Sequence, residues 1–259
     1  MIIRSALKKK LLKGERVIGT FVGLDSVDTV EILGRSGFDF VILDMEHAPG
    51  APNSIMGQIR AAEGTGMDVL ARLTNVERTT VLRTLDLGVS GVLAPQVNDA
   101  VTARSFIDAT LYPPLGCRGF AGTRAAAYGS VPILEYIAEA NTQLLRMVQC
   151  ETEQAVRDVE EIASIKDIDL IFVGPYDLSL SLGVPGDMFH PKMAEAVAKV
   201  LAVCGKFGKL AGIFVSSEEE MKKRIEQGFT FFAYSMDTMI FAAAAKAIAD
   251  GARRLADER

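Results

Sequence analysis

Residues 170–177 read LIFVGPYD, an apolar run that leads through a glycine and a proline into a carboxylate. Strands buried on both faces, as in a parallel sheet, are continuously apolar rather than alternating. Residues 144–151, LLRMVQCE, follow the same plan and end in Glu151. A strand core has no use for a charge, so the two runs predict buried parallel strands whose ends carry a functional site.

Similar runs recur along the whole chain. The eight strand candidates are Val17–Gly23, Phe38–Glu46, Asp68–Thr74, Gly91–Val97, Leu144–Glu151, Leu170–Asp177, Lys209–Ser216 and Phe229–Asp237. Amphipathic helical patterns such as SVDTVEILGRSG and SEEEMKKRIEQG lie between them and close on glycine, a common helix stop. Eight β-then-α units in about 250 residues predict an α/β protein with a closed (β/α)8 TIM barrel. A doubly wound open sheet remains the alternative fold. Residues 1–259 are expected to form one domain.

The composition narrows the choice of partners. The chain has 259 residues, 49% of them apolar, and a formal net charge of −5. This acidic balance provides no basic patch for nucleic acid. No apolar run approaches the ~20 residues of a membrane span. We therefore expect small-molecule substrates and neither a nucleic-acid nor a membrane partner.

The N-terminal segment and the cysteines predict a cytoplasmic protein. The segment MIIRSALKKKLLKGE lacks the long apolar core of a secretory signal. It is more typical of a short amphipathic helix, with Leu7, Leu11 and Leu12 on one face. The three cysteines are too scattered for a disulfide framework or a zinc knuckle: Cys117, Cys150 and Cys204.

Polar residues cluster where the predicted strands end, which is where barrel enzymes place their active sites. They are Asp44, Glu46, His47, Arg72, Gln149, Glu151 and Asp177. Two carboxylates without cysteine–histidine spacing suit a hard cation such as Mg²⁺ or Mn²⁺, with Co²⁺ or Zn²⁺ also accommodated. Such a metal, an arginine and the amide groups after a glycine–proline turn would bind a 2-oxo acid and stabilise its enolate.

Each of these residues also has a purely structural interpretation. Glu151 and Asp177 could each sit at the start of a helix, where a carboxylate complements the dipole. Arg72 could pair with a carboxylate, and His47 could cap a turn. Asp86 ends a helix, where its charge opposes the dipole, so it needs a partner elsewhere, either His47 or an arginine. The long segment YPPLGCRGFAGTRAAAYG predicts a shaped, basic and functional loop.

Six motifs resemble one family, the metal-dependent class II pyruvate aldolases of the HpcH/HpaI type. The motifs are GFDFVILDMEH, ARLTN, LDLGVSGVLAPQV, YPPLGCRG, VQCET and IFVGPYDLSLSLG, in the family's order and spacing. The resemblance spans nearly the whole chain. It implies a barrel of the phosphoenolpyruvate/pyruvate superfamily, usually assembled as a hexamer through exchanged C-terminal helices.

The resemblance also implies roles for individual residues. Glu151 and Asp177 would hold the metal, and Arg72 would bind the enolate oxygen. His47 would act as acid and base through a metal-bound water, with Asp86 of a neighbouring subunit as its partner. The remaining implied roles are orientation of ligands and water (Asp44, Gln149), substrate binding (Gly174, Pro175, Tyr176, Asp177) and the aldehyde side of the mouth (Arg118, Arg124).

The implied reaction is reversible cleavage of a 4-hydroxy-2-oxo acid to pyruvate and an aldehyde through a metal-stabilised enolate, as in the catabolism of aromatic compounds. The predicted cofactor is Mg²⁺, Mn²⁺ or Co²⁺. Tyr176 stands where many members have a smaller residue, which leaves the aldehyde open. The alternatives are a carbon–carbon lyase acting on a coenzyme A thioester and a non-catalytic 2-oxo acid binding protein.

Overall fold

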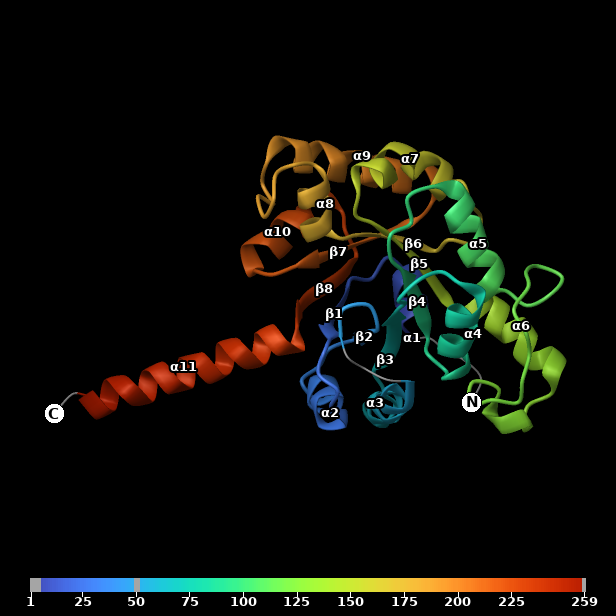
Figure 1. The fold of residues 1–259 in the computed structure, drawn as a ribbon, viewed down its shortest axis with the longest axis horizontal. Coiled ribbons are helices and arrows are strands. Elements are labelled where there is room, and N and C mark those ends of the chain that lie inside the picture. The colour runs from blue at the N-terminus through green and yellow to red at the C-terminus, as the bar shows by residue number, and fades with distance from the viewer. Residues whose placement is uncertain (1–5, 49–51, 258–259) are drawn as a thin grey trace.

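Eight parallel strands close into a barrel in which every strand pairs with its neighbours in sequence (Figure 1). The computed structural model describes residues 6–48 and 52–257. The strands are β1 (Val17–Val22), β2 (Phe40–Asp44), β3 (Asp68–Arg72), β4 (Gly91–Ala94), β5 (Leu145–Cys150), β6 (Leu170–Val173), β7 (Leu210–Val215) and β8 (Phe231–Met236). Each lies inside its predicted run. Because β8 pairs with β1, the predicted (β/α)8 barrel is confirmed and the open sheet is wrong.

Most helices lie between the strands in sequence and pack around the barrel, whereas the first precedes β1 and the last extends away from the barrel (Figure 1). The helices are α1 (Ala6–Leu12), α2 (Val27–Arg35), α3 (Pro52–Thr65), α4 (Arg78–Asp86), α5 (Ala100–Thr110), α6 (Ile133–Gln143), α7 (Glu153–Ala163), α8 (Pro175–Ser181), α9 (Pro191–Phe207), α10 (Glu218–Gln227) and α11 (Asp237–Asp257), with a 3₁₀ turn η1 (Ala127–Gly129). Side chains cap several of them: Ser26 accepts a hydrogen bond from the Thr29 amide and Thr152 from the Ala155 amide. Such caps satisfy amides that a helix start leaves without partners.

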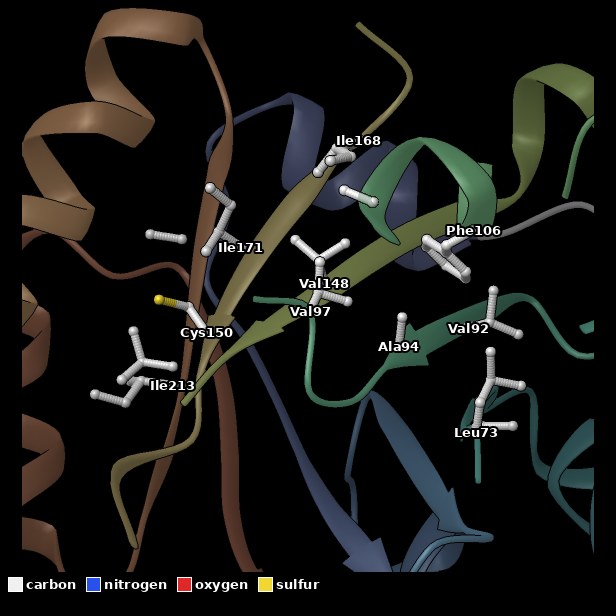
Figure 2. Packing of buried hydrophobic residues seen from close by; sticks show 14 of the residues in the cluster. Leu73, Val92, Ala94, Val97, Phe106, Val148, Cys150, Ile168, Ile171 and Ile213 are labelled. Atoms are coloured by element: carbon white, nitrogen blue, oxygen red, sulfur yellow. The ribbon is translucent and has the colours of Figure 1, made fainter. Parts of the chain in front are cut away.

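Each strand is buried on both sides because it separates two apolar layers. Between barrel and helices lie residues such as Val92, Ala94, Val148 and Ile171, in one cluster with Phe106 of α5 (Figure 2). The barrel interior is filled by a separate cluster: Phe40, Ile42, Leu70, Leu93, Leu145, Met147, Leu170, Phe172 and Phe231. The continuous apolar runs of the sequence reflect these two layers.

Close packing inside the barrel depends on a glycine in β1. The rings of Phe40 and Phe231 stack with centroids 4.3 Å apart. A Cβ on Gly19 would lie 2.3 Å from the Phe40 ring, so no larger residue fits opposite it. Interior atoms at such density leave no channel through the barrel, and ligands must bind at an end.

Helix α1 lies at the N-terminal ends of the strands. Leu7 and Leu11 are each 1% exposed and join the interior cluster, and the Leu7 amide donates to Asp68 at the start of β3. The prediction for Leu12 is wrong, because this side chain is 72% exposed. Residues four apart share a helix face, whereas Leu12 is rotated by about 100° from Leu11.

Helix α11 runs away from the barrel (Figure 1). Its large apolar side chains Phe241, Ile248 and Leu255 are 70%, 74% and 73% exposed. Their spacing of seven residues places them on one face of the helix. Among the described helices, α11 included, none combines the length and apolarity needed to cross a membrane.

Candidate active site

A cavity of about 220 Å³ opens at the C-terminal ends of the strands. The structure brings eight of the predicted site residues to its wall: Asp44, His47, Arg72, Gln149, Gly174, Pro175, Tyr176 and Asp177. They come from β2, β3, β5 and the segment after β6, and closure of the barrel turns these strand ends toward one mouth. Glu151 follows β5 directly and contacts this group through Gln149.

Arg72 is fixed by two carboxylates. Asp44 and Arg72 are register partners at the ends of β2 and β3. Arg72 donates from Nε and Nη2 to the two Asp44 oxygens at 3.0 and 2.7 Å, and its Nη1 lies 3.3 Å from Glu46 Oε2. Burial by itself would raise the pKa of the Asp44 carboxyl, but the hydrogen bonds and charge of Arg72 outweigh burial and lower this pKa. The guanidinium is therefore held in one orientation at the cavity wall.

Asp44 also shapes the segment that carries His47. Its Oδ1 accepts hydrogen bonds from the backbone amides of Glu46 and His47 at 3.0 and 3.3 Å. The His47 side chain is 64% exposed, with Nε2 3.8 Å from Glu46 Oε2. An exposed imidazole at the mouth of a cavity can exchange protons with a bound ligand and with water.

Glu151 is a buried carboxylate with few partners. It is 1% exposed, and Oε1 accepts a hydrogen bond of 2.8 Å from the Gln96 amide while Oε2 accepts one from the Gln149 side chain. Burial raises the pKa of Glu151 to about 7, and the nearby charges of Asp177 and Glu46 act in the same direction against the bond from Gln96. A cation beside these carboxylates would remove the cost of their charge.

The surroundings of Glu151 suit a small hard cation. Gln149 Oε1 is buried and accepts no hydrogen bond from the described residues. A Cβ on Gly174 would lie 2.9 Å from Glu151 Oε2 and 2.8 Å from Gln149 Nε2, so glycine keeps this space open. Within residues 6–48 and 52–257, no three histidine, cysteine or acidic side chains cluster as a metal site. A metal bound by Glu151 and Asp177 would thus keep positions for substrate and water.

The structural interpretation fails for Glu151 and holds for Asp177, which also faces the cavity. Thr152, not Glu151, caps α7, since its hydroxyl oxygen accepts a hydrogen bond from the Ala155 backbone amide. Gly174 precedes α8 without a side-chain cap, and Asp177 lies in the first turn with its side chain on the cavity. Arg72 likewise pairs with a carboxylate, as its structural interpretation predicts, and it lines the cavity as well.

Asp86, Arg118 and Arg124 do not line the cavity of their own chain. Asp86 ends α4 and accepts a hydrogen bond of 3.2 Å from Arg118, so an arginine and not His47 is its partner within the chain. Arg118 is buried, with its Cζ 4.6 Å from the centre of the Tyr112 ring. Arg124 pairs with Glu63. Both arginines point away from the cavity of their own chain because the loop folds back against α3, α4 and α6, so their place on the aldehyde side stays a prediction.

Sequence reasoning missed the apolar wall of the cavity and one backbone donor. The wall consists of Phe21, Phe172, Phe214, Met236 and Met239. Aromatic residues within apolar runs are indistinguishable from core residues in sequence. The donor is the amide of Gln96, a residue with a φ of 53° that follows β4. No side-chain signal identifies a backbone donor.

Comparison with known proteins shows to which family the chain belongs. The sequence profile described as HpcH/HpaI aldolase/citrate lyase matches residues 17–244. The chain belongs to this family. A 4-hydroxy-2-oxo-heptane-1,7-dioate aldolase of Escherichia coli is 32% identical over 249 residues, 95% of this chain and 94% of the relative. A 5-keto-4-deoxy-D-glucarate aldolase of Klebsiella pneumoniae is 33% identical over 254 residues, 98% of each protein.

The fold is shared as well. The crystal structure of an HpcH/HpaI aldolase from Desulfitobacterium hafniense superposes with a TM-score of 0.91 at 33% identity, covering 99% of this chain and 98% of that one. The family expected from the six motifs is confirmed. Its members support the expected aldolase activity, a lyase reaction on small molecules.

Proposed function

We propose that this protein is a metal-dependent aldolase that reversibly cleaves a 4-hydroxy-2-oxo acid to pyruvate and an aldehyde. The observation that carries the proposal is the buried carboxylate of Glu151, close enough to Asp177 for their charges to interact, beside an arginine of fixed orientation. Mg²⁺, Mn²⁺ or Co²⁺ held by these two carboxylates would act as a Lewis acid toward the 2-oxo acid. Family membership supports this reaction class.

The protein's own groups have separate tasks in the proposed reaction. Arg72 stabilises the negative charge that develops on the 2-oxo oxygen, and Asp44 fixes the direction of its donors. Gln149 orients Glu151. The turn Gly174–Asp177 provides the wall against which the keto acid lies. His47, exposed at the mouth, takes the proton of the 4-hydroxyl in cleavage and returns it in condensation.

The assembly is part of the proposal. A face of α11 with Phe241, Ile248 and Leu255 exposed is unfavourable in water and suits the barrel of a second copy. We propose that residues 1–259 form one domain whose C-terminal helix is exchanged between subunits, in a hexamer. The Asp86 side chain keeps 20% exposure, and we assign it the task of supporting His47 of a neighbouring subunit.

The cysteines support a cytoplasmic location for the proposed enzyme. All three are free, and Cys150 and Cys204 are buried. Burial raises the pKa of both thiols to about 12, which keeps them protonated and unreactive.

No observation favours either of the two alternatives, a carbon–carbon lyase acting on a coenzyme A thioester or a non-catalytic 2-oxo acid binding protein. The cavity of about 220 Å³ is below the usual range of sites for large ligands, which disfavours a coenzyme A thioester. A plain 2-oxo acid binding protein would not need an acid–base group at the cavity mouth.

Pyruvate release from a 4-hydroxy-2-oxo acid, followed by a coupled assay, tests the proposal. With Mg²⁺ present, we expect turnover by the wild type and a loss of at least about 100-fold in Glu151→Gln. The matched control is Glu153→Gln, an exposed glutamate two residues further on, which should behave as wild type. Full activity in Glu151→Gln, or binding of pyruvate without any turnover by the wild type, would overturn the proposal.

A further inference from the structure

The wall of the cavity divides into two contiguous arcs. Strands β2, β3 and β5 contribute its polar groups, among them Asp44, Arg72 and Gln149. Strands β6, β7, β8 and β1 contribute Phe172, Phe214, Met236 and Phe21 in turn. Because neighbouring strands in this barrel are consecutive and β8 closes onto β1, the second set forms one apolar arc opposite the polar one.

Aromatic contacts run continuously along the apolar arc. The Phe21 ring lies 6.1 Å from Phe172 in an edge-to-face contact and 6.1 Å from Phe214. Phe214 in turn meets Tyr176 edge to face at 5.6 Å. Such contacts restrict the rings, so the arc is a preformed surface rather than a set of independent side chains.

The arc extends from the barrel core to the water. Phe172 is 1% exposed at its inner end, whereas Tyr176 and Met239 at the rim are 46% and 45% exposed. Apolar surface that lines a cavity and stays in contact with water gains free energy when a ligand covers it. The polar arc, together with the backbone of the turn Gly174–Asp177 and the Asp177 carboxylate, serves the keto acid, so the apolar side chains of the other arc are left for the other half of the substrate.

Positive charge is scarce on this side of the cavity. Among the described residues that line the cavity, Arg72 is the one lysine or arginine. It is already paired with Asp44 and Glu46. A carboxylate at the far end of the aldehyde would lie against the aromatic rings of this arc, which carries no lysine or arginine among the described lining residues. Removing a carboxylate from water without a partner is strongly unfavourable.

We infer that the aldehyde half of the substrate is uncharged and apolar, an aryl or branched alkyl aldehyde, and this inference rests on the proposed aldolase function. The cleavable acids then carry an apolar group on C4. In cleavage the 4-hydroxyl loses its proton, the C3–C4 bond breaks, and C4 becomes the aldehyde carbonyl. The electron pair stays on C3 as the pyruvate enolate, which takes up a proton to give pyruvate.

The test compares two substrates by kcat/KM for pyruvate release with saturating Mg²⁺. One is 4-hydroxy-2-oxo-4-phenylbutanoate, and the other is 4-hydroxy-2-oxo-heptane-1,7-dioate, named for the Escherichia coli relative. We expect the phenyl compound to be preferred by about tenfold or more. Equal rates, or preference for the diacid, would overturn this inference and leave the aldolase function intact. Cleavage of neither acid would overturn both.

Variants of the rim residue Tyr176 distinguish an effect on substrate preference from an effect on folding. Because its side chain is half exposed, replacement should leave the fold intact, which a thermal melt checks. Tyr176→Ala should lower the preference for the phenyl compound about tenfold, and Tyr176→Arg should shift it further toward the diacid. Phe189→Ala, an aromatic residue 52% exposed outside the cavity, is the matched control and should keep the wild-type ratio. An unchanged ratio in Tyr176→Arg would contradict a role of the apolar arc.

Discussion

Asp44 and Arg72, the last residues of β2 and β3, form two parallel hydrogen bonds of 3.0 and 2.7 Å. They are paired in the register of the sheet, so the barrel itself sets their separation. A bidentate contact between a guanidinium and a carboxylate fixes the orientation of the two groups as well as their distance. The residue proposed to stabilise the enolate is thus oriented by the sheet before any substrate binds.

Replacing Arg72 by lysine should therefore cost activity despite the retained charge. A single ammonium reproduces neither the two bonds to Asp44 nor the third contact with Glu46. We expect kcat/KM for pyruvate release to fall by about 100- to 1000-fold at a temperature where the variant is folded, and the melting temperature to fall as well because the two bonds to Asp44 are buried. Arg35→Lys, at an exposed i,i+4 pair with Glu31, provides the control and should be silent. Wild-type kinetics in Arg72→Lys would exclude a directional role.

Asp44 should make stability depend on pH. Its pKa is lower in the folded protein than in the unfolded chain, so its contribution is present above the unfolded value of about 4 and is lost as pH falls through the folded value. Asp44→Asn should be less stable at pH 7 and should lose less stability on acidification. Urea unfolding at pH 7, 4 and 3 measures this, with exposed Asp25→Asn as the control. Parallel pH profiles for wild type and Asp44→Asn would refute the assignment.

A methyl group at Gly174 should harm the site and spare the fold. The added Cβ would lie within 3.0 Å of both Gln149 Nε2 and Glu151 Oε2, and must displace one of them. We expect kcat/KM to fall by at least about tenfold. Gly64→Ala is the matched control, because a Cβ there meets nothing within 4 Å. Gly64 lies in the last turn of α3, so that change should leave kcat/KM at the wild-type value and should not lower stability. If Gly174→Ala retains full activity, the close packing around Glu151 has no functional meaning.

The proposed exchange of α11 between subunits can be tested by substitutions on the apolar face of this helix. Ile248→Asp introduces a charge at a side chain that is 74% exposed within one chain. We expect a smaller sedimentation coefficient at micromolar concentration, because the charge must be buried when the face is covered. Arg253→Asp, away from the stripe of Phe241, Ile248 and Leu255, should change the coefficient much less. An identical coefficient in both variants and the wild type would argue against a covered face.

The fold followed from the sequence because buried parallel strands have a strong signature. All eight strands lie inside the predicted runs, and each ends one to four residues before its run does, as with Met45 and Glu46 after Asp44. Those ends were also the signal for the site, since a charge closing an apolar run has few structural uses. The positions of Asp44, Arg72, Gln149 and Asp177 on one cavity wall were predictable for this reason.

Other features depend on contacts that sequence spacing does not encode. The loop that carries Arg118 and Arg124 folds onto Asp86 and Glu63, which lie 32 and 61 residues away along the chain. The apolar arc was missed because Phe21 and Phe214 have the same surroundings in sequence as core phenylalanines. Only closure of the barrel shows that these rings face a cavity.

The most direct test of the central proposal is metal dependence of pyruvate release. The protein is treated with EDTA, dialysed, and assayed with a 4-hydroxy-2-oxo acid before and after addition of Mg²⁺, Mn²⁺ or Co²⁺. The proposal predicts that activity disappears with EDTA, returns with at least one of these ions, and does not return in Glu151→Gln. Undiminished pyruvate release from metal-free protein would contradict it.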